Sequence, residues 1–222
     1  MKKLILILAA ALVALSASAQ ETADADTLWK FSGTTSLNLS QLSLTNWAAG
    51  GDNSLSGNVL INVSANYASD NTSWENKLIL GYGLIKQGDD PTRKSDDQID
   101  FASKLGLKAS EKWFYTALLG FNTQFSEGYD RPSEDDRVKI SNFMAPGYMN
   151  LALGMDYKPS DAFSLLIAPL SGKFTFVLDD ELSSESFGLD PGENFRGEFG
   201  AYIKMTYKKE ILKNVILDTK ID

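Results

Sequence analysis

Residues 57–83 read GNVLINVSANYASDNTSWENKLILGYG and contain two runs in which apolar and polar side chains alternate. The first run places Val59 and Ile61 between asparagines and serines, and the second run begins at Trp74. Successive side chains of a strand point to opposite faces, so each run predicts a strand with one apolar face and one polar face. The polar segment 69–72 predicts a tight turn between them. The apolar face must then contact either a protein core or lipid, and this choice decides the class of the protein.

The N-terminus has the features of a secretory signal peptide. Two lysines precede the apolar run 4–15, and Ala17-Ser18-Ala19 forms an A-x-A cleavage site before Gln20. The run is too short to span a membrane and has the flanks of a segment that is removed. We therefore expect a signal peptide over residues 1–19, cleavage between Ala19 and Gln20, and an exported domain over residues 20–222.

The composition excludes several classes of protein. The chain of 222 residues has no cysteine and no histidine, so it predicts no disulfide framework, no His-dependent catalytic triad and no His-ligated metal. Its net charge is −8, which becomes −10 without the two signal-peptide lysines, and this argues against nucleic acid as a partner. No apolar stretch of about 18 residues follows the signal peptide, so no transmembrane helix is expected. We therefore expect that the protein is not an enzyme and that it binds no cofactor.

The alternation of apolar and polar residues continues along most of the chain and predicts an all-β domain. Nine strands are expected, over about residues 31–40, 57–67, 74–84, 99–109, 113–125, 149–157, 163–167, 199–207 and 215–221. After Gln41 the apolar residues fall on the opposite face of the strand, and this shift predicts a β-bulge at that position. Pro169 cannot donate to a ladder, so it predicts a bulge or the end of its strand.

The connections between these strands alternate in length. Short turns are expected at 69–72, 111–112, 159–162 and 208–214, and longer polar connections at 46–54, 86–98, 126–146 and 171–195. Short turns at one end and long loops at the other are typical of outer-membrane barrels. The chain therefore predicts an antiparallel up-and-down transmembrane β-barrel, with the apolar face toward lipid.

Aromatic residues next to the short turns support this interpretation. They lie on the apolar face at one end of their strands, where the aromatic girdle of a membrane barrel would lie. The alternative is that they fill a protein core. The expected membrane-interface aromatics are Tyr67, Trp74, Trp113, Tyr157, Phe163 and Tyr207.

Charged residues of both signs fall on the polar face, which becomes the lumen of a barrel. We expect them to pair across the interior, where they would narrow it and influence its selectivity. The expected lumen charges are Glu75, Lys77, Asp100, Lys104, Lys108, Asp156, Arg196, Glu198 and Lys204, with Asp218 and Lys220 on the last strand.

The expected long loops contain an aromatic residue and several acidic groups. Trp47 is expected to cap the rim of the barrel, with stacking on a lipopolysaccharide sugar as the alternative. None of the acidic groups has the spacing of a calcium-binding loop, so we expect solvated loops and no metal site. These groups are Asp89-Asp90, Asp96-Asp97, Glu134-Asp135-Asp136 and Asp179-Asp180-Glu181.

Several segments resemble an uncharacterised family of Bacteroidetes outer-membrane β-barrel proteins, known only as a domain of unknown function. They are Trp29-Lys30-Phe31, NLSQLSLTNWAAGGDNSLSGN (38–58), WENKLILGYGL (74–84), KSDDQIDFASKLGLKASEKWFY (94–115) and APLSGKFTFVLDDEL (168–182). The resemblance implies a place in the outer membrane, contact with its lipid and lipopolysaccharide, and insertion by the barrel-assembly machinery. It implies no substrate and no catalytic residue.

The same resemblance implies that further chain follows residue 222. Barrels of this kind usually finish with a strand that ends in an aromatic residue, whereas this sequence stops at Ile221-Asp222, inside its ninth expected strand. Bacterial barrels have an even number of strands, so we expect a C-terminally incomplete domain and at least about ten strands in the full protein.

Three functions are compatible with these features. The first is a narrow pore or channel for small solutes that the sequence does not identify, suggested by the charged, glycine-rich polar face. The second is a non-conducting envelope protein with a structural or partner-binding role. The third is a soluble lipocalin-like binding barrel in the periplasm, in which the apolar face is a core.

Overall fold

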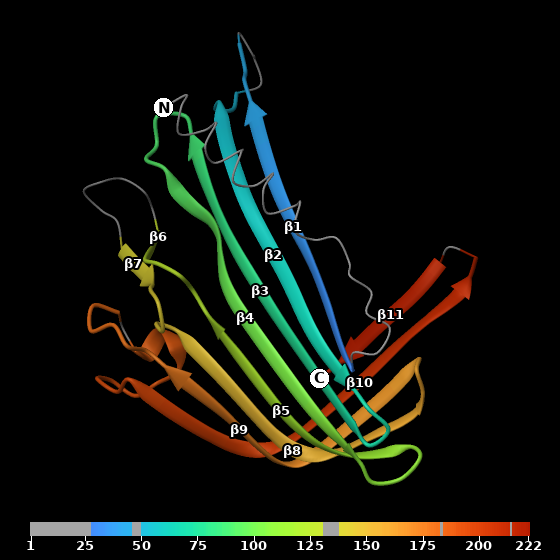
Figure 1. Cartoon of the computed structure of the whole chain (residues 1–222). Coiled ribbons are helices and arrows are strands. Elements are labelled where there is room, and N and C mark those ends of the chain that lie inside the picture. The colour runs from blue at the N-terminus through green and yellow to red at the C-terminus, as the bar shows by residue number, and fades with distance from the viewer. Residues whose placement is uncertain (1–27, 46–49, 131–137, 183, 214) are drawn as a thin grey trace.

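The computed structural model describes residues 28–45, 50–130, 138–182, 184–213 and 215–222, and most of this part forms one large sheet (Figure 1). Nine antiparallel strands lie in the order β1-β2-β3-β4-β5-β8-β9-β10-β11, so each strand pairs with its neighbours along the chain. These strands are β1 (Trp29–Leu42), β2 (Ser54–Ala68), β3 (Thr72–Gln87), β4 (Arg93–Lys108), β5 (Trp113–Thr123), β8 (Gly147–Ser160), β9 (Phe163–Phe176), β10 (Phe195–Leu212) and β11 (Val215–Ile221). The all-β class and the nine expected strands are confirmed.

Three smaller elements lie in the connections. Strands β6 (Gly128–Asp130) and β7 (Val138–Ser141) form a separate antiparallel hairpin between β5 and β8. A short 3-10 helix, Ser184–Phe187, lies between β9 and β10. No helix in the described part of the chain is long and apolar enough to cross a membrane. The sequence analysis missed the hairpin because its strands are too short to show alternation.

The long strands extend beyond their apolar segments. Strand β4 begins at Arg93, so the expected loop 86–98 is wrong, and Asp96 and Asp97 lie in the ladder opposite Gly83 and Tyr82. A ladder requires only backbone donors and acceptors, so polar residues can extend a strand past its apolar band. Side-chain alternation therefore identifies the band rather than the full strand.

One of the two expected bulges is present. The register of β1 and β2 runs without a break from Leu39 opposite Gly57 to Leu42 opposite Ser54, so the bulge expected at Gln41 is wrong. The apolar residues fall on the other face at this point because the apolar band of the strand ends there, while the hydrogen-bonded ladder of β1 and β2 continues. At Pro169 the expectation is confirmed, because both neighbouring strands shift register beside it.

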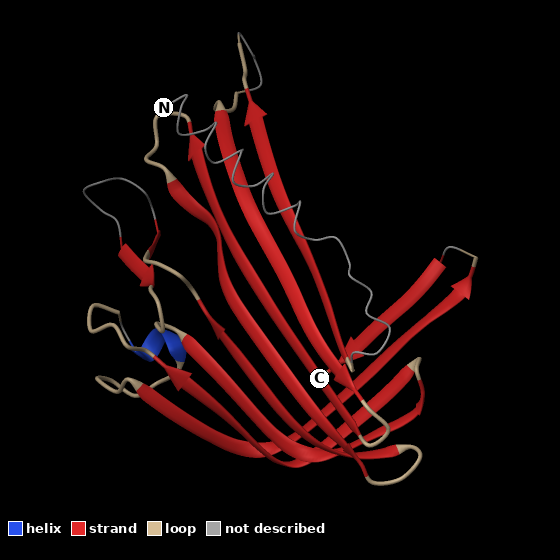
Figure 2. Ribbon diagram, viewed as in Figure 1, coloured by secondary structure: helices blue, strands red, loops and turns tan. Residues whose placement is uncertain are grey.

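The alternation of short and long connections is confirmed except between β3 and β4, where the connection 88–92 is a turn of five residues instead of the expected long loop. Connections 69–71, 109–112, 161–162 and 213–214 lie at one end of the sheet, which we call the short-turn end. Strands β1 and β2, β3 and β4, β5 and β8, and β9 and β10 are connected at the opposite end, the long-loop end (Figure 2). The end of the sheet that carries the long loops also carries the β6–β7 hairpin and the 3-10 helix.

The sheet is a single curved layer whose two faces differ in chemistry. It bends into a trough (Figure 1). Serines, asparagines and lysines are frequent among the residues that line its concave face. Apolar side chains project from the convex face, where Phe31 is 74% exposed, Leu39 75% and Phe199 78%. Few large apolar side chains of the described residues are buried, and those of the convex face have no second layer over them. Within the described chain, the apolar face is not a protein core.

The two edges of the sheet remain unpaired among the described strands. Strand β1 pairs with β2, and β11 pairs with β10, but β1 and β11 are not hydrogen-bonded to each other. The described sheet is therefore an open antiparallel meander.

Gly154 is expected to be required for the packing of β8 against β9. A Cβ atom at this position would overlap the carbonyl oxygen of Ile167 and the Cα of Ala168, both backbone atoms that cannot rotate away. We expect Gly154→Ala to lower the free energy of unfolding by about 1–3 kcal/mol. Gly200→Ala is the control, because no atom lies within 4 Å of a Cβ built there. Urea unfolding in detergent micelles measures both, and equal stabilities would contradict the packing argument.

Candidate functional site

The concave face encloses a hollow of about 1160 Å³ to which all nine strands contribute. Ser32 and Thr34 of β1 line one side of it, and Lys220 of β11 lines the other. Residues at opposite edges of the sheet therefore face the same space. Most of the residues that line it are polar, because most strands turn their polar residues inward, whereas β5 contributes Leu118, Leu119 and Gly120.

The structure brings together part of the expected set of lumen charges. Glu75, Lys77, Lys104 and Lys204 line the hollow, and the sequence analysis also assigned Lys220 to it. Asp100 accepts a hydrogen bond from the Asn122 amide at 2.6 Å, and Arg196 forms an ion pair with Glu198 at 2.9 Å along one strand. Lys108 is exposed and is not among the lining residues. Lys173, Lys208 and Asp222 also line the hollow and were missed.

Asp156 is the centre of a buried polar network at the short-turn end. Its side chain is almost completely buried and forms an ion pair with Lys104 on β4. The Ser164 hydroxyl donates to its other oxygen at 2.6 Å. Lys158 Nζ lies 3.7 Å from Asp156 and 3.5 Å from Glu75, which links β3, β4, β8 and β9. A buried carboxylate requires such partners, and here their charges offset its own.

The six expected interface aromatics form three cross-strand pairs at the short-turn end. Tyr67 lies opposite Trp74, and Trp113 lies opposite Tyr157 with ring centroids 4.9 Å apart. Phe163 of β9 lies opposite Tyr207 of β10. Cross-strand aromatic pairs of this kind stabilise a sheet by about 0.2–1 kcal/mol each. The girdle residues expected from sequence therefore share one level on the convex face.

Trp29, the first residue of β1, extends this aromatic level to the edge of the sheet. Its ring centroid lies 5.3 Å from that of Tyr67 and 5.6 Å from that of Trp74.

A second group of aromatic side chains lies at the long-loop end and was missed from sequence. Phe174 stacks on Phe195 and meets Phe199 edge-on, with ring centroids 6.1 and 5.8 Å apart. Tyr82 and Phe125 form an edge-on pair at 6.3 Å. These residues lie far from the short turns, so proximity to a turn could not identify them. Phe174 and Phe195 were moreover assigned to the long connection 171–195, whereas β9 extends to Phe176 and β10 begins at Phe195.

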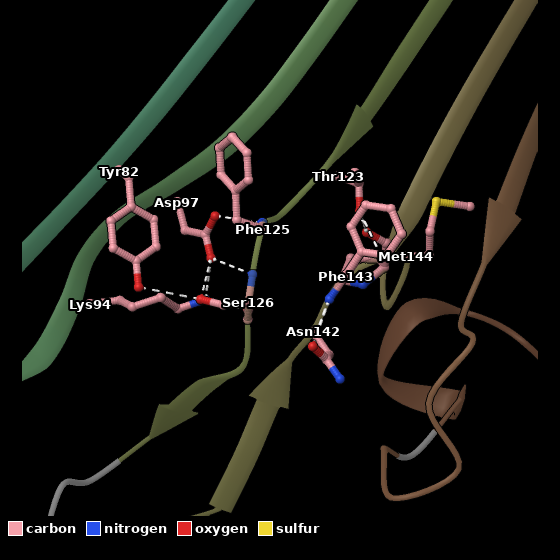
Figure 3. A network of polar contacts seen from close by, with 10 residues as sticks. Tyr82, Lys94, Asp97, Thr123, Phe125, Ser126, Asn142, Phe143 and Met144 are labelled. Atoms are coloured by element: carbon pink, nitrogen blue, oxygen red, sulfur yellow. Dashed lines mark hydrogen bonds and ion pairs between the residues drawn. The ribbon is translucent and has the colours of Figure 1, made fainter. Parts of the chain in front are cut away.

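A polar network joins the long loop 124–146 to the ends of β3 and β4 (Figure 3). Asp97 accepts from Lys94 Nζ at 2.5 Å and from the backbone N–H groups of Phe125 and Ser126 at 2.7 and 3.2 Å. Lys94 also donates to the Ser126 carbonyl at 2.6 Å. Asp97 therefore holds the start of this loop against the sheet rather than forming part of an acidic loop.

The hairpin β6–β7 is attached to the β9–β10 connection through Lys139. Its ammonium lies 2.7 Å from Asp179, 3.0 Å from Glu181 and 3.2 Å from Glu127. Hydrogen bonds from Lys139 and Asn142 hold the pKa of Asp179 below its usual value, and Tyr129 and Lys139 do the same for the pKa of Glu127. These carboxylates in turn raise the pKa of Lys139, Asp179 most strongly.

A small apolar cluster lies in the same group of loops. Ala145, Val177, Leu182 and Leu189 are buried together, and Phe187 packs against them. We call this cluster, with the ion pairs of Lys139, the loop assembly. It gives the long-loop end a packed surface of its own, which the expectation of solvated acidic loops did not include.

The remaining expectations fall outside the described residues or concern metal binding. The signal peptide over 1–19, Trp47 and Glu134-Asp135-Asp136 all lie outside the described part of the chain. Among the residues that the structure describes, no three or more acidic, histidine or cysteine side chains are grouped in a way that could hold a metal ion.

One family of proteins is similar to part of this chain. Residues 39–129 match a family described as a protein of unknown function (DUF3078). The matched region contains β2 to β5, and it includes the segments 74–84 and 94–115 that carry the resemblance in sequence. No curated protein and no solved structure matches the chain.

The loop assembly is expected to loosen in acid. Asp179 and Glu127 have lowered pKa values in the folded protein, so their stabilising contribution is complete above their unfolded values of 3.8 and 4.5. It is lost as the pH falls through the lower folded values, because protonation breaks the pairs with Lys139. Hydrogen exchange of residues 139–146 and 178–189, corrected for the intrinsic rate, should accelerate below about pH 4.

Asp179→Asn tests the cause of this acid response. It removes the closest carboxylate of Lys139, so we expect faster exchange at neutral pH and a weaker dependence on pH. Exchange that depends on pH as strongly as in the unmodified protein would contradict this assignment.

Proposed function

We propose that this chain forms a β-barrel in the outer membrane of a bacterium of the Bacteroidetes type, and that its interior is a narrow pore for small solutes. The observation that carries the proposal is the combination of an uncovered apolar convex face with a polar hollow on the concave side. Lipid is the environment in which such a face is stable, because exposure of this much apolar surface to water is unfavourable.

The separation of the two aromatic levels supports a membrane location. On β3, Trp74 lies at the short-turn level and Tyr82 at the long-loop level, eight residues further along the strand. At about 3.3 Å per residue and a tilt of about 40°, this separation corresponds to about 20 Å along the membrane normal. Outer-membrane barrels have an apolar band about 25 Å tall between two aromatic girdles.

Closure of the sheet is part of the proposal. Unpaired backbone groups are not tolerated in the hydrocarbon region, so the edges at β1 and β11 must be joined in the membrane, directly or through further strands. Export through the signal peptide 1–19 and insertion by the barrel-assembly machinery are the expected route. The short-turn end would then face the periplasm, and the loop assembly would face lipopolysaccharide outside the cell.

Ile61 and Asn62 allow a matched test of the lipid-facing surface. They are neighbours at the middle of β2, with Ile61 on the apolar face and Asn62 lining the hollow. We expect Ile61→Arg to lower the stability of the protein in lipid vesicles by about 2–4 kcal/mol, the cost of a charge at the bilayer midplane. Asn62→Arg should cost less than about 1 kcal/mol, because its side chain enters a polar space.

Urea titration of protein folded into vesicles measures both variants. Equal stability of the two variants would contradict the assignment of the apolar face to lipid.

The proposed function is tested by two measurements on the full-length protein. Protein from outer-membrane fractions should change its gel mobility on boiling and should produce stable conductance in planar lipid bilayers. Recovery as soluble periplasmic protein, with one mobility before and after boiling, would contradict the membrane location. A membrane-inserted protein that remains silent in bilayers would contradict the pore alone.

The second candidate function is a non-conducting envelope protein that binds a partner. The specific observation in its favour is the loop assembly, since a packed surface at the long-loop end is suited to recognition. The buried network around Asp156 would also narrow the interior at the short-turn end. Silence in bilayers, together with altered envelope integrity in a deletion strain, would favour this function.

A soluble lipocalin-like barrel is the least favoured alternative. Such a barrel fills or lines its interior with apolar side chains and turns polar residues to water. Here serine, asparagine and lysine side chains make up most of the interior lining, and the most exposed large apolar side chains, such as Phe31, Leu39 and Phe199, project outward.

A further inference from the structure

The hollow has a charge opposite to that of the chain. Eight charged residues line it, and six of them are lysines. The chain as a whole carries a net charge of −8, so the excess of lysine is local to the hollow. The lining lysines are Lys77, Lys104, Lys173, Lys204, Lys208 and Lys220, and the lining acids are Glu75 and Asp222.

Half of these lysines are neutralised by carboxylates. Lys104 pairs with the buried Asp156. The Lys208 ammonium lies 3.3 Å from a carboxylate oxygen of Asp218. The Lys220 ammonium lies 3.6 Å from a carboxylate oxygen of Asp222. These pairs contribute little net charge to the hollow, and the Asp222 carboxylate on its wall is already matched.

The other three lysines lack such a partner. Within the described chain, no carboxylate lies within 4.0 Å of the ammonium of Lys77, Lys173 or Lys204. Glu75, the remaining lining acid, lies 3.5 Å from the Lys158 ammonium instead. The hollow therefore has an uncompensated positive charge.

The neighbours of these lysines in the ladder explain why they remain unpaired. Lys77 lies between Ser64 and Ala102. Lys204 lies opposite Leu166 on β9, and on its β11 side it interacts with both Lys220 and Asp222, which pair with each other. Lys173 is opposite Asn150 and Glu198, but the Glu198 carboxylate pairs with Arg196 at 2.9 Å.

The ammonium of Lys173 lies 5.7 Å above the Tyr148 ring. An aromatic face leaves the charge of a lysine uncompensated, because it attracts the cation without carrying a negative charge of its own.

We propose that the hollow selects small anions, a step that rests on the pore function proposed above. Lys77 on β3, Lys173 on β9 and Lys204 on β10 present positive charge from different parts of the wall. Low-dielectric walls focus the field of such charges into the enclosed water and raise the local concentration of counter-ions. A unit charge about 4 Å away in water-like surroundings changes the concentration of a monovalent ion roughly fivefold.

The test is the reversal potential of the full-length protein in planar bilayers under a potassium chloride gradient. Chloride and potassium ions have similar mobilities in water, so the sign of the reversal potential reports the selectivity of the pore. We expect chloride to permeate several-fold better than potassium. Conductance without preference, or with preference for potassium, would overturn this inference and leave the pore function intact. Silence in bilayers would overturn the pore function and the inference together.

A triple substitution assigns the selectivity to the three lysines. Lys77→Gln, Lys173→Gln and Lys204→Gln keep the approximate size of each side chain, and we expect them to bring the chloride-to-potassium permeability ratio close to one. The matched control is Lys86→Gln, Lys209→Gln and Lys213→Gln, which removes the same charge from residues that do not line the hollow.

Folding of both triple variants is checked by their gel mobility before and after boiling. An equal loss of selectivity in both variants would overturn the assignment, because the effect would then reflect net charge rather than the charge of the hollow. If the lysine-to-glutamine variant at the hollow fails to fold, the reversal potential of the unmodified protein still decides the proposal.

Discussion

Every strand of this sheet is constrained to place its apolar side chains on the convex face. The constraint arises because nine strands share one continuous antiparallel sheet with only local register shifts, so a slip of one residue along a whole strand would exchange its two faces. It aligns the cross-strand aromatic pairs at the short-turn end and directs serine, asparagine and lysine into a common hollow. The apolar surface and the polar interior are therefore two results of one arrangement.

The charged residues on the concave side fall into two groups, one paired and one without carboxylate partners. At the short-turn end, Asp156 is buried with Lys104, Ser164 and Lys158 around it, and the opposite charges cancel. Elsewhere on the wall, Lys77 has uncharged neighbours in the ladder, and Lys204 lies beside a Lys220–Asp222 pair whose charges offset each other, so neither lysine has a carboxylate of its own. A mixed set of charges in the sequence can thus produce a neutral network in one place and a positive wall in another.

The long-loop end has a different kind of stability from the sheet. Its connections are held by Asp97 on the loop backbone, by the ion pairs of Lys139 and by a small apolar cluster around Leu182. These contacts join segments from β5 to β10 without adding strands to the sheet. Acid sensitivity is therefore expected in the loops, where Asp179 and Glu127 carry part of the attachment and have lowered pKa values.

The sequence by itself determined the all-β class, the nine strands, three of the four long connections, and the aromatic level next to the short turns. These features follow from side-chain alternation and from turn residues, which are local properties of the chain. It also identified five of the eight charged residues that line the hollow. It did not identify the ends of β4, the β6–β7 hairpin or the Phe174–Phe195–Phe199 cluster. Only the tertiary structure decided which lysines are paired, because a lysine and its carboxylate partner come from different strands, such as Lys104 on β4 and Asp156 on β8. The distance between two side chains on separate strands depends on register and curvature, and neither can be read from local pattern.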